Sequence, residues 1–144
     1  MMKAAQHDDL ITQQMATTKE LMRYVACIDL PLDHIPREVQ AMIGYIYAHL
    51  FEPTLSVEAI KTACGTRNNN VTTRFQQATG MGIWKYIVAR RLEAAAVVLS
   101  TLEVNMYILA AAVGYTEEAF SKAFKNAYEC SPFRYHRNKY KRNG

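Results

Sequence analysis

The chain has 144 residues, of which 50% are apolar and 10% aromatic, enough for one domain with its own core and too apolar for a disordered protein. Residues 1–40 carry a net charge of −2, from four basic and six acidic residues, and the remainder carries +6, from 13 basic and seven acidic ones, which suits a polyanionic partner. No apolar run is long enough to cross a bilayer or to resemble a secretory signal, so we expect a cytoplasmic protein.

Apolar residues recur at intervals of three and four along nearly the whole chain, which predicts an all-α fold. Thr17 and Glu20 form a capping-box pattern that predicts the start of a helix at Thr17. Pro36 suits the first turn of the next helix, and Pro53 ends it. A long helix is expected over 83–100. Its apolar stripe comprises Trp84, Ile87, Val88, Leu92, Ala95 and Leu99.

Two segments, 56–76 and 105–125, match without a gap at an offset of 49 residues. The matched pairs are Ser56 and Asn105, Ile60 and Leu109, Gly65 and Gly114, Val71 and Phe120, and Phe75 and Phe124. The first pair can cap a helix start, and the glycines can take the left-handed conformation that ends a helix. The repeat therefore predicts two helix-turn-helix units, over about 56–80 and 105–129, joined by the helix over 83–100. Such a unit can also serve packing alone, but two copies on a basic chain favour DNA.

The length of the joining helix bears on how DNA could be bound. About 17 residues at 1.5 Å each give roughly 25 Å, to which the bodies of the two units add. The second helix of each unit could then lie about one DNA turn, roughly 34 Å, from the other. A monomer could enter two successive major grooves, and the oligomeric state stays open.

The segment 39–140 resembles the DNA-binding domain of the AraC/XylS family of bacterial transcription regulators. The resemblance rests on VTTRFQQATGMGIWKYIVARRLEAA in the first half and NMYILAAAVGYTEEAFSKAFKNAYECSPFRYHR in the second. It implies seven helices in two homeodomain-like helix-turn-helix subdomains and sequence-specific binding to promoter DNA. On this basis 36–144 is the DNA-binding domain and 1–35 is a short helical extension. RNA polymerase is a candidate second partner. Lys61 departs from the family, which usually has a small alanine there.

The second helix of each unit supplies the candidate base-reading residues. Amide and hydroxyl side chains can recognise base edges in the major groove, although the same residues could be ordinary solvent-facing polar groups. In the first unit the candidates are Asn68, Asn69, Asn70, Thr72, Thr73 and Gln76, and in the second they are Ser121 and Lys122. Thr116 is expected to cap the second of these helices, with Glu117 and Glu118 complementing its dipole. We expect the first unit to supply most of the specificity.

Basic residues outside these positions are candidates for phosphate contacts. They are Arg67, Arg74, Arg90, Arg91, Lys125, Arg134 and Arg137. For Arg90 and Arg91 an ion pair with Glu93 is an equal alternative. Trp84 and Tyr135 are expected to pack in the core.

The sequence offers no candidate for catalysis, a metal or a cofactor. No histidine has a partner at metal-ligand spacing, and no phosphate-binding loop or nucleophile motif occurs. Three separate cysteines, Cys27, Cys64 and Cys130, are expected to be buried, reduced thiols. A DNA-binding regulator is therefore the leading hypothesis. The alternative is a protein–protein adaptor whose acidic N-terminal segment and Glu-bearing second unit contact another protein and whose helix-turn-helix units no longer read DNA.

Overall fold

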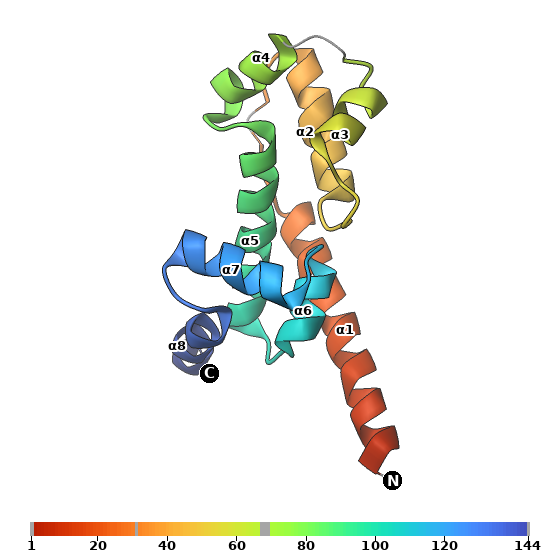
Figure 1. Cartoon of the computed structure of the whole chain (residues 1–144), viewed down its shortest axis with the longest axis vertical. Helices are drawn as coiled ribbons and strands as arrows, with labels where there is room; N and C mark the ends of the chain where they lie inside the picture. The colour runs from red at the N-terminus through yellow and green to blue at the C-terminus, as the bar shows by residue number, and fades with distance from the viewer. Residues whose placement is uncertain (1, 31, 67–69, 144) are drawn as a thin grey trace.

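The computed structural model describes residues 2–30, 32–66 and 70–143, with side chains described from 9 to 140 within these ranges. This part of the chain forms eight helices and no strand, which confirms the all-α prediction (Figure 1). The helices are α1 Met2–Ala26, α2 Arg37–His49, α3 Val57–Ala63, α4 Asn70–Thr79, α5 Ile83–Thr101, α6 Met106–Ala112, α7 Glu117–Tyr128 and α8 Pro132–Asn143. None of the described helices is long and apolar enough to span a membrane.

The helices form two bundles along α5. The first unit consists of α2, α3, α4 and the N-terminal part of α5, and the second consists of the C-terminal part of α5 with α6, α7 and α8. Each unit has its own apolar core: residues 83–87 of α5 belong to the first core, and residues 92–99 belong to the second. Figure 1 shows the first unit around the upper end of α5 and the second around its lower half.

Helix α1 packs on the second unit and is continuous from Met2 to Ala26. The Tyr24 hydroxyl donates to Glu93 of α5 at 2.8 Å, and the side-chain oxygen of Gln13 accepts from the backbone amide of Asn105 at 2.9 Å. The predicted helix start at Thr17 is wrong, because Thr17 lies within the helix and is fully buried. Its hydroxyl has no hydrogen-bond partner among the described residues.

Replacing this hydroxyl is expected to stabilise the protein. Thr17→Val keeps the shape of the side chain and removes a buried polar group, whose unmet desolvation costs about 1–3 kcal/mol. We expect the free energy of unfolding in urea to rise by about 1 kcal/mol. The exposed neighbour Thr18 provides the control, since Thr18→Val should change stability by less than about 0.5 kcal/mol. A loss of stability in Thr17→Val would contradict the prediction.

The 49-residue repeat is present in the structure down to individual hydrogen bonds. Ser56 and Asn105 cap α3 and α6, accepting bonds from backbone amides at 3.0 and 2.8 Å respectively. After these helices Gly65 has a φ of 68° and Gly114 a φ of 97°, so both turns use the left-handed region as predicted. Thr66 N donates to Lys61 O at 2.9 Å, and at the equivalent positions Tyr115 N donates to Ala110 O at 2.8 Å.

The repeat extends to the ends of the two predicted helix-turn-helix segments and continues beyond them. After α4 and α7, Gly80 and Glu129 lie 49 residues apart and both have a positive φ, 80° and 63°. Further on, Tyr86 packs edge-on against Phe75 at a centroid distance of 5.4 Å. Tyr135 packs against Phe124 in the same way at 5.3 Å.

Helix α5 takes part in the repeat twice. Its first part matches α8, and its second part matches α2. Three buried residues of α2, and the buried Leu50 that follows it, stand 49 positions before four buried residues of α5: Met42 and Arg91, Ile43 and Leu92, Ile46 and Ala95, and Leu50 and Leu99. The helix is therefore the last helix of the first unit and the first helix of the second.

The two turn glycines differ in what surrounds them, which gives a matched pair of variants. A Cβ on Gly65 would meet nothing within 4 Å, whereas one on Gly114 would lie 3.1 Å from Phe51 O and from the guanidinium of Arg91. We expect Gly65→Ala to cost about 1 kcal/mol for the left-handed conformation. Gly114→Ala should cost at least about 1 kcal/mol more, because backbone must shift. Equal losses in chemical denaturation would show that the contact at Gly114 is easily relieved.

Candidate nucleic-acid interface

Helix α4 has one buried face and one polar face. Val71 and Phe75 are buried in the first core. Thr72 is half-buried, and Thr73 and Gln76 are exposed on the other side of the helix. Asn70, the first described residue of α4, is also exposed, whereas Arg67, Asn68 and Asn69 lie outside the described residues. The polar face thus carries short hydroxyl and amide groups of the kind that can bond base edges.

Helix α7 presents the equivalent face of the second unit with different chemistry. Phe120 and Phe124 are fully buried. The residues 49 positions after Thr72, Thr73 and Gln76 are Ser121, Lys122 and Lys125, of which the two lysines are exposed. The same helix face is therefore neutral and polar in the first unit and basic in the second.

The N-terminus of α7 has the predicted cap. The Thr116 hydroxyl oxygen accepts from the amide of Ala119 at 3.2 Å, and Glu117 and Glu118 lie exposed in the first turn. Carboxylates at this end of a helix are favourable, because the unpaired amides there carry a partial positive charge. The local structure thus accounts for both glutamates without a base contact.

Three predicted phosphate contacts are exposed arginines. Arg74 forms an ion pair with Glu38 at 2.7 Å, and both side chains are about half exposed. Arg134 and Arg137 are exposed on α8, where the guanidinium of Arg137 lies 6.0 Å from the ring centroid of Phe133.

The two arginines of α5 have partners within the protein. Arg90 pairs with Glu93 at 3.3 Å, one of the two roles expected for it. The phosphate contact predicted for Arg91 is wrong, because its side chain is 1% exposed. Its Nε donates to Leu50 O at 2.7 Å and a terminal nitrogen donates to Glu52 O at 2.6 Å. Sequence spacing alone could not show this, since both acceptors are backbone groups about 40 residues away.

Two aromatic predictions have opposite outcomes. Tyr135 packs against the second core as expected. Trp84 is 46% exposed, so the prediction that it packs in the core is wrong, and Tyr86 occupies the buried position instead. Burial and the hydrogen bond with Tyr47 raise the pKa of the Tyr86 hydroxyl well above its ordinary value, which keeps it neutral.

The cysteines and acidic groups form no metal centre in the described part of the chain. All three cysteines are free, but Cys27 is exposed and the other two are partly exposed, so the expectation of buried thiols is wrong.

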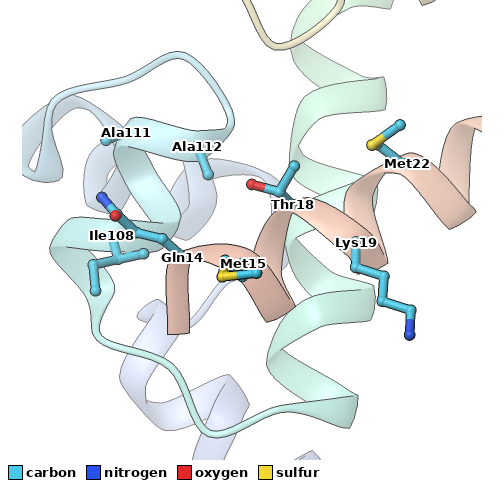
Figure 2. Close-up of a pocket in the computed structure, with 8 residues that line it drawn as sticks. All are labelled: Gln14, Met15, Thr18, Lys19, Met22, Ile108, Ala111 and Ala112. Atoms are coloured by element: carbon cyan, nitrogen blue, oxygen red, sulfur yellow. The ribbon is translucent and has the colours of Figure 1, made fainter. Parts of the chain in front are cut away.

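A groove of about 770 Å³ lies between α1 and α6, and none of its lining residues belongs to α4 or α7. Figure 2 shows its lining: Gln14, Met15, Thr18, Lys19 and Met22 of α1, and Ile108, Ala111 and Ala112 of α6. Sequence periodicity does not predict this groove, because it depends on how α1 packs. Met15 and Met22 are each about two-thirds exposed there.

Comparison with known proteins connects these features to a family. The regulatory protein SoxS of Salmonella typhimurium is 30% identical over 98 residues, which cover 67% of this chain and 91% of SoxS. The chain belongs to the AraC/XylS family of DNA-binding transcription regulators. The regulator AlkR of Acinetobacter baylyi is 32% identical over 99 residues, but this match covers only 32% of AlkR. No protein-family model matches the chain.

Solved structures support the AraC/XylS assignment at the level of the fold. The C-terminal domain of the response regulator AraT from Geobacillus stearothermophilus superposes with a TM-score of 0.70 at 27% identity, covering 74% of this chain and 88% of that domain. The DNA-binding domain of AdpA, solved with a target DNA, has a TM-score of 0.68 at 19% identity. It covers 74% of this chain and 96% of that domain.

Proposed function

We propose that the protein regulates transcription by placing α4 and α7 in two successive major grooves of promoter DNA. The observation that carries this proposal is the repeat: two copies of one unit expose the same face of their second helix and are held by one shared helix. With 19 residues, α5 is about 28 Å long. This length suits the spacing of roughly 34 Å between successive turns of a groove.

The exposed faces of α4 and α7 are proposed to have different roles in DNA binding. The amide and hydroxyl groups of α4 read base edges, with Asn70, Thr72, Thr73 and Gln76 from the described residues and Asn68 and Asn69 from the preceding undescribed ones. Lys122 and Lys125 of α7 hold the DNA mainly through phosphates, and Ser121 contacts a base edge, so that the second groove also has a preferred sequence position. This division follows from the side chains at matched positions, since lysine is a flexible point charge and Asn or Gln can bond two groups of an adenine.

Arginines at the rim are proposed to add affinity without specificity. Arg74 would have to exchange Glu38 for a phosphate, a small cost because an exposed ion pair contributes about 0–1 kcal/mol. Arg134 and Arg137 are exposed on α8, and Arg67, which lies outside the described residues, stays a predicted phosphate contact.

Binding is expected to weaken steeply with salt. The five described cations proposed to meet phosphates, Arg74, Lys122, Lys125, Arg134 and Arg137, should give a slope of about −4.5 for log K against log salt concentration. The measurement is a mobility shift on a site selected from a random DNA pool, titrated from low to moderate salt. Lys19→Ala, on α1, is the control and should leave the slope unchanged.

The same selection tests the proposed function itself. An enriched sequence that is bound better than random DNA at moderate salt is the expected result. Failure to enrich any sequence would overturn the proposal and favour the adaptor. One chain carries both reading helices, so the proposal requires no second subunit. It places the protein in the cytoplasm, with RNA polymerase as a further partner to be tested.

A further inference from the structure

The guanidinium of Arg91 lies where the two units meet. From α5 it reaches the end of α2, donating to the carbonyls of Leu50 and Glu52 at 2.7 and 2.6 Å. The turn of the second unit also lies against it, since a Cβ on Gly114 would come within 3.1 Å of the guanidinium. The ring of Tyr115, next in this turn, has its centroid 5.2 Å from the same group. Arg91 therefore contacts the segment just after α2 and the α6–α7 turn at once.

The surroundings stabilise the buried charge without a carboxylate. The hydrogen bonds of Arg91 in the described part of the chain go to backbone carbonyls just after α2, where the helix dipole is negative. The planar guanidinium can donate to two carbonyls and stack on aromatic rings at the same time, which a lysine cannot do. The nearby carboxylate of Glu52 is directed to His49 instead, at 2.8 Å.

The repeat shows that the guanidinium is not needed to pack the helix. The equivalent position of the first unit is Met42, which is fully buried and apolar. An unbranched apolar side chain thus fits this position of the bundle. At Arg91 the guanidinium has partners from both sides of the junction, namely the carbonyls just after α2 and the turn of the second unit.

We propose that Arg91 is a positioning residue that fixes the separation and orientation of the two units. Through them it fixes the spacing that the protein accepts between two half-sites, the DNA segments contacted by α4 and by α7. The part concerning half-site spacing rests on the proposed function. One base pair added between half-sites turns the second groove by about 34° and moves it by about 3.4 Å. A rigid junction cannot follow that change, whereas a loosened one can.

The experiment measures the junction with and without DNA. Spin labels are attached at Gln77 of α4 and Asn126 of α7, which are exposed and 49 positions apart, in a protein whose three cysteines are replaced by serine. The distance between the labels reports the distance between the two helices. The protein with Arg91 should give a narrow distribution of distances between the labels, and the Arg91→Met variant should give a broad one. On duplexes with half-site spacings changed by one base pair, wild-type affinity should fall about tenfold and that of Arg91→Met less than about threefold.

Controls separate positioning from a general loss of structure. Arg90→Met removes the adjacent arginine and should leave both the label distances and the shape of the spacing profile unchanged. Arg91→Lys keeps the charge but loses the paired hydrogen bonds, so it should behave like Arg91→Met and serves if that variant does not fold. Unchanged label distances in these Arg91 variants, or a spacing profile as steep as the wild type, would overturn the inference. Absence of sequence-specific binding by the wild type would instead overturn the proposed function, and the label distances would still decide the role of Arg91.

Discussion

Phe124→Ala is expected to lower the free energy of unfolding by about 3–5 kcal/mol. Phe124 is fully buried on α7, with ring centroids 4.5 Å from Tyr128 and 5.3 Å from Tyr135. Truncation removes these contacts and leaves a cavity that surrounding helices cannot fill. Since a domain is typically stable by only about 5–15 kcal/mol, this loss would remove a large part of the stability of the fold.

The measurement is urea denaturation followed by circular dichroism. Phe75→Ala, the equivalent change in the first unit, should cost a similar amount, because Phe75 is equally buried. Phe133→Ala is the matched control: this phenylalanine is 62% exposed on α8 and should change stability by less than about 0.5 kcal/mol. A comparable loss in Phe133→Ala would mean that burial does not decide the effect.

The second large effect is expected on sequence preference. Replacing Thr72, Thr73 and Gln76 of α4 with alanine removes every proposed base-reading group among the described residues of α4 except Asn70. Helix propensity is retained, because alanine is the best helix former. The ratio of affinities for the selected site and for random DNA should fall by roughly 10- to 100-fold, since one bidentate base contact contributes about 1–3 kcal/mol. Affinity for random DNA should change little, as no charge is lost.

The equivalent triple change in α7 should have a different signature. Replacing Ser121, Lys122 and Lys125 with alanine removes two cations and one base contact, so affinity should fall for both specific and random DNA, and sequence preference should fall less than in the α4 variant. The salt slope should become shallower by about 2. Competition mobility shifts at several salt concentrations distinguish the two outcomes. If the α7 variant lost sequence preference and the α4 variant kept it, the proposed division between the units would be reversed.

The predictable part of this fold is the part encoded by local chemistry. Ser56 and Asn105 were identifiable as caps, and Gly65 and Gly114 as helix ends, because each role depends on one residue type and its immediate neighbours. The burial of the paired phenylalanines followed from their helical spacing. The family resemblance rested on the same positions and is confirmed by the comparison with SoxS.

The errors concern residues whose partners are distant in sequence. A buried arginine needs acceptors, and those of Arg91 are backbone carbonyls beyond another helix. Trp84 was assigned to the core because a single stripe was expected on α5. A helix that serves two units is apolar on more than one face, so periodicity did not identify the buried side of its first turn. The start of α1 was misplaced at Thr17 because a capping pattern also occurs inside a helix.

The double role of α5 restricts how this protein can be divided or altered. A cut within α5 would deprive one bundle of its last helix or the other of its first, so no single cut there leaves both units as complete folds. Inserting a single residue into the helix would rotate everything beyond it by about 100° and advance it by about 1.5 Å. The length of α5 should therefore be far less tolerant of insertion and deletion than its surface is of substitution. Variation in such a protein has to come from exchanging side chains on α4 and α7.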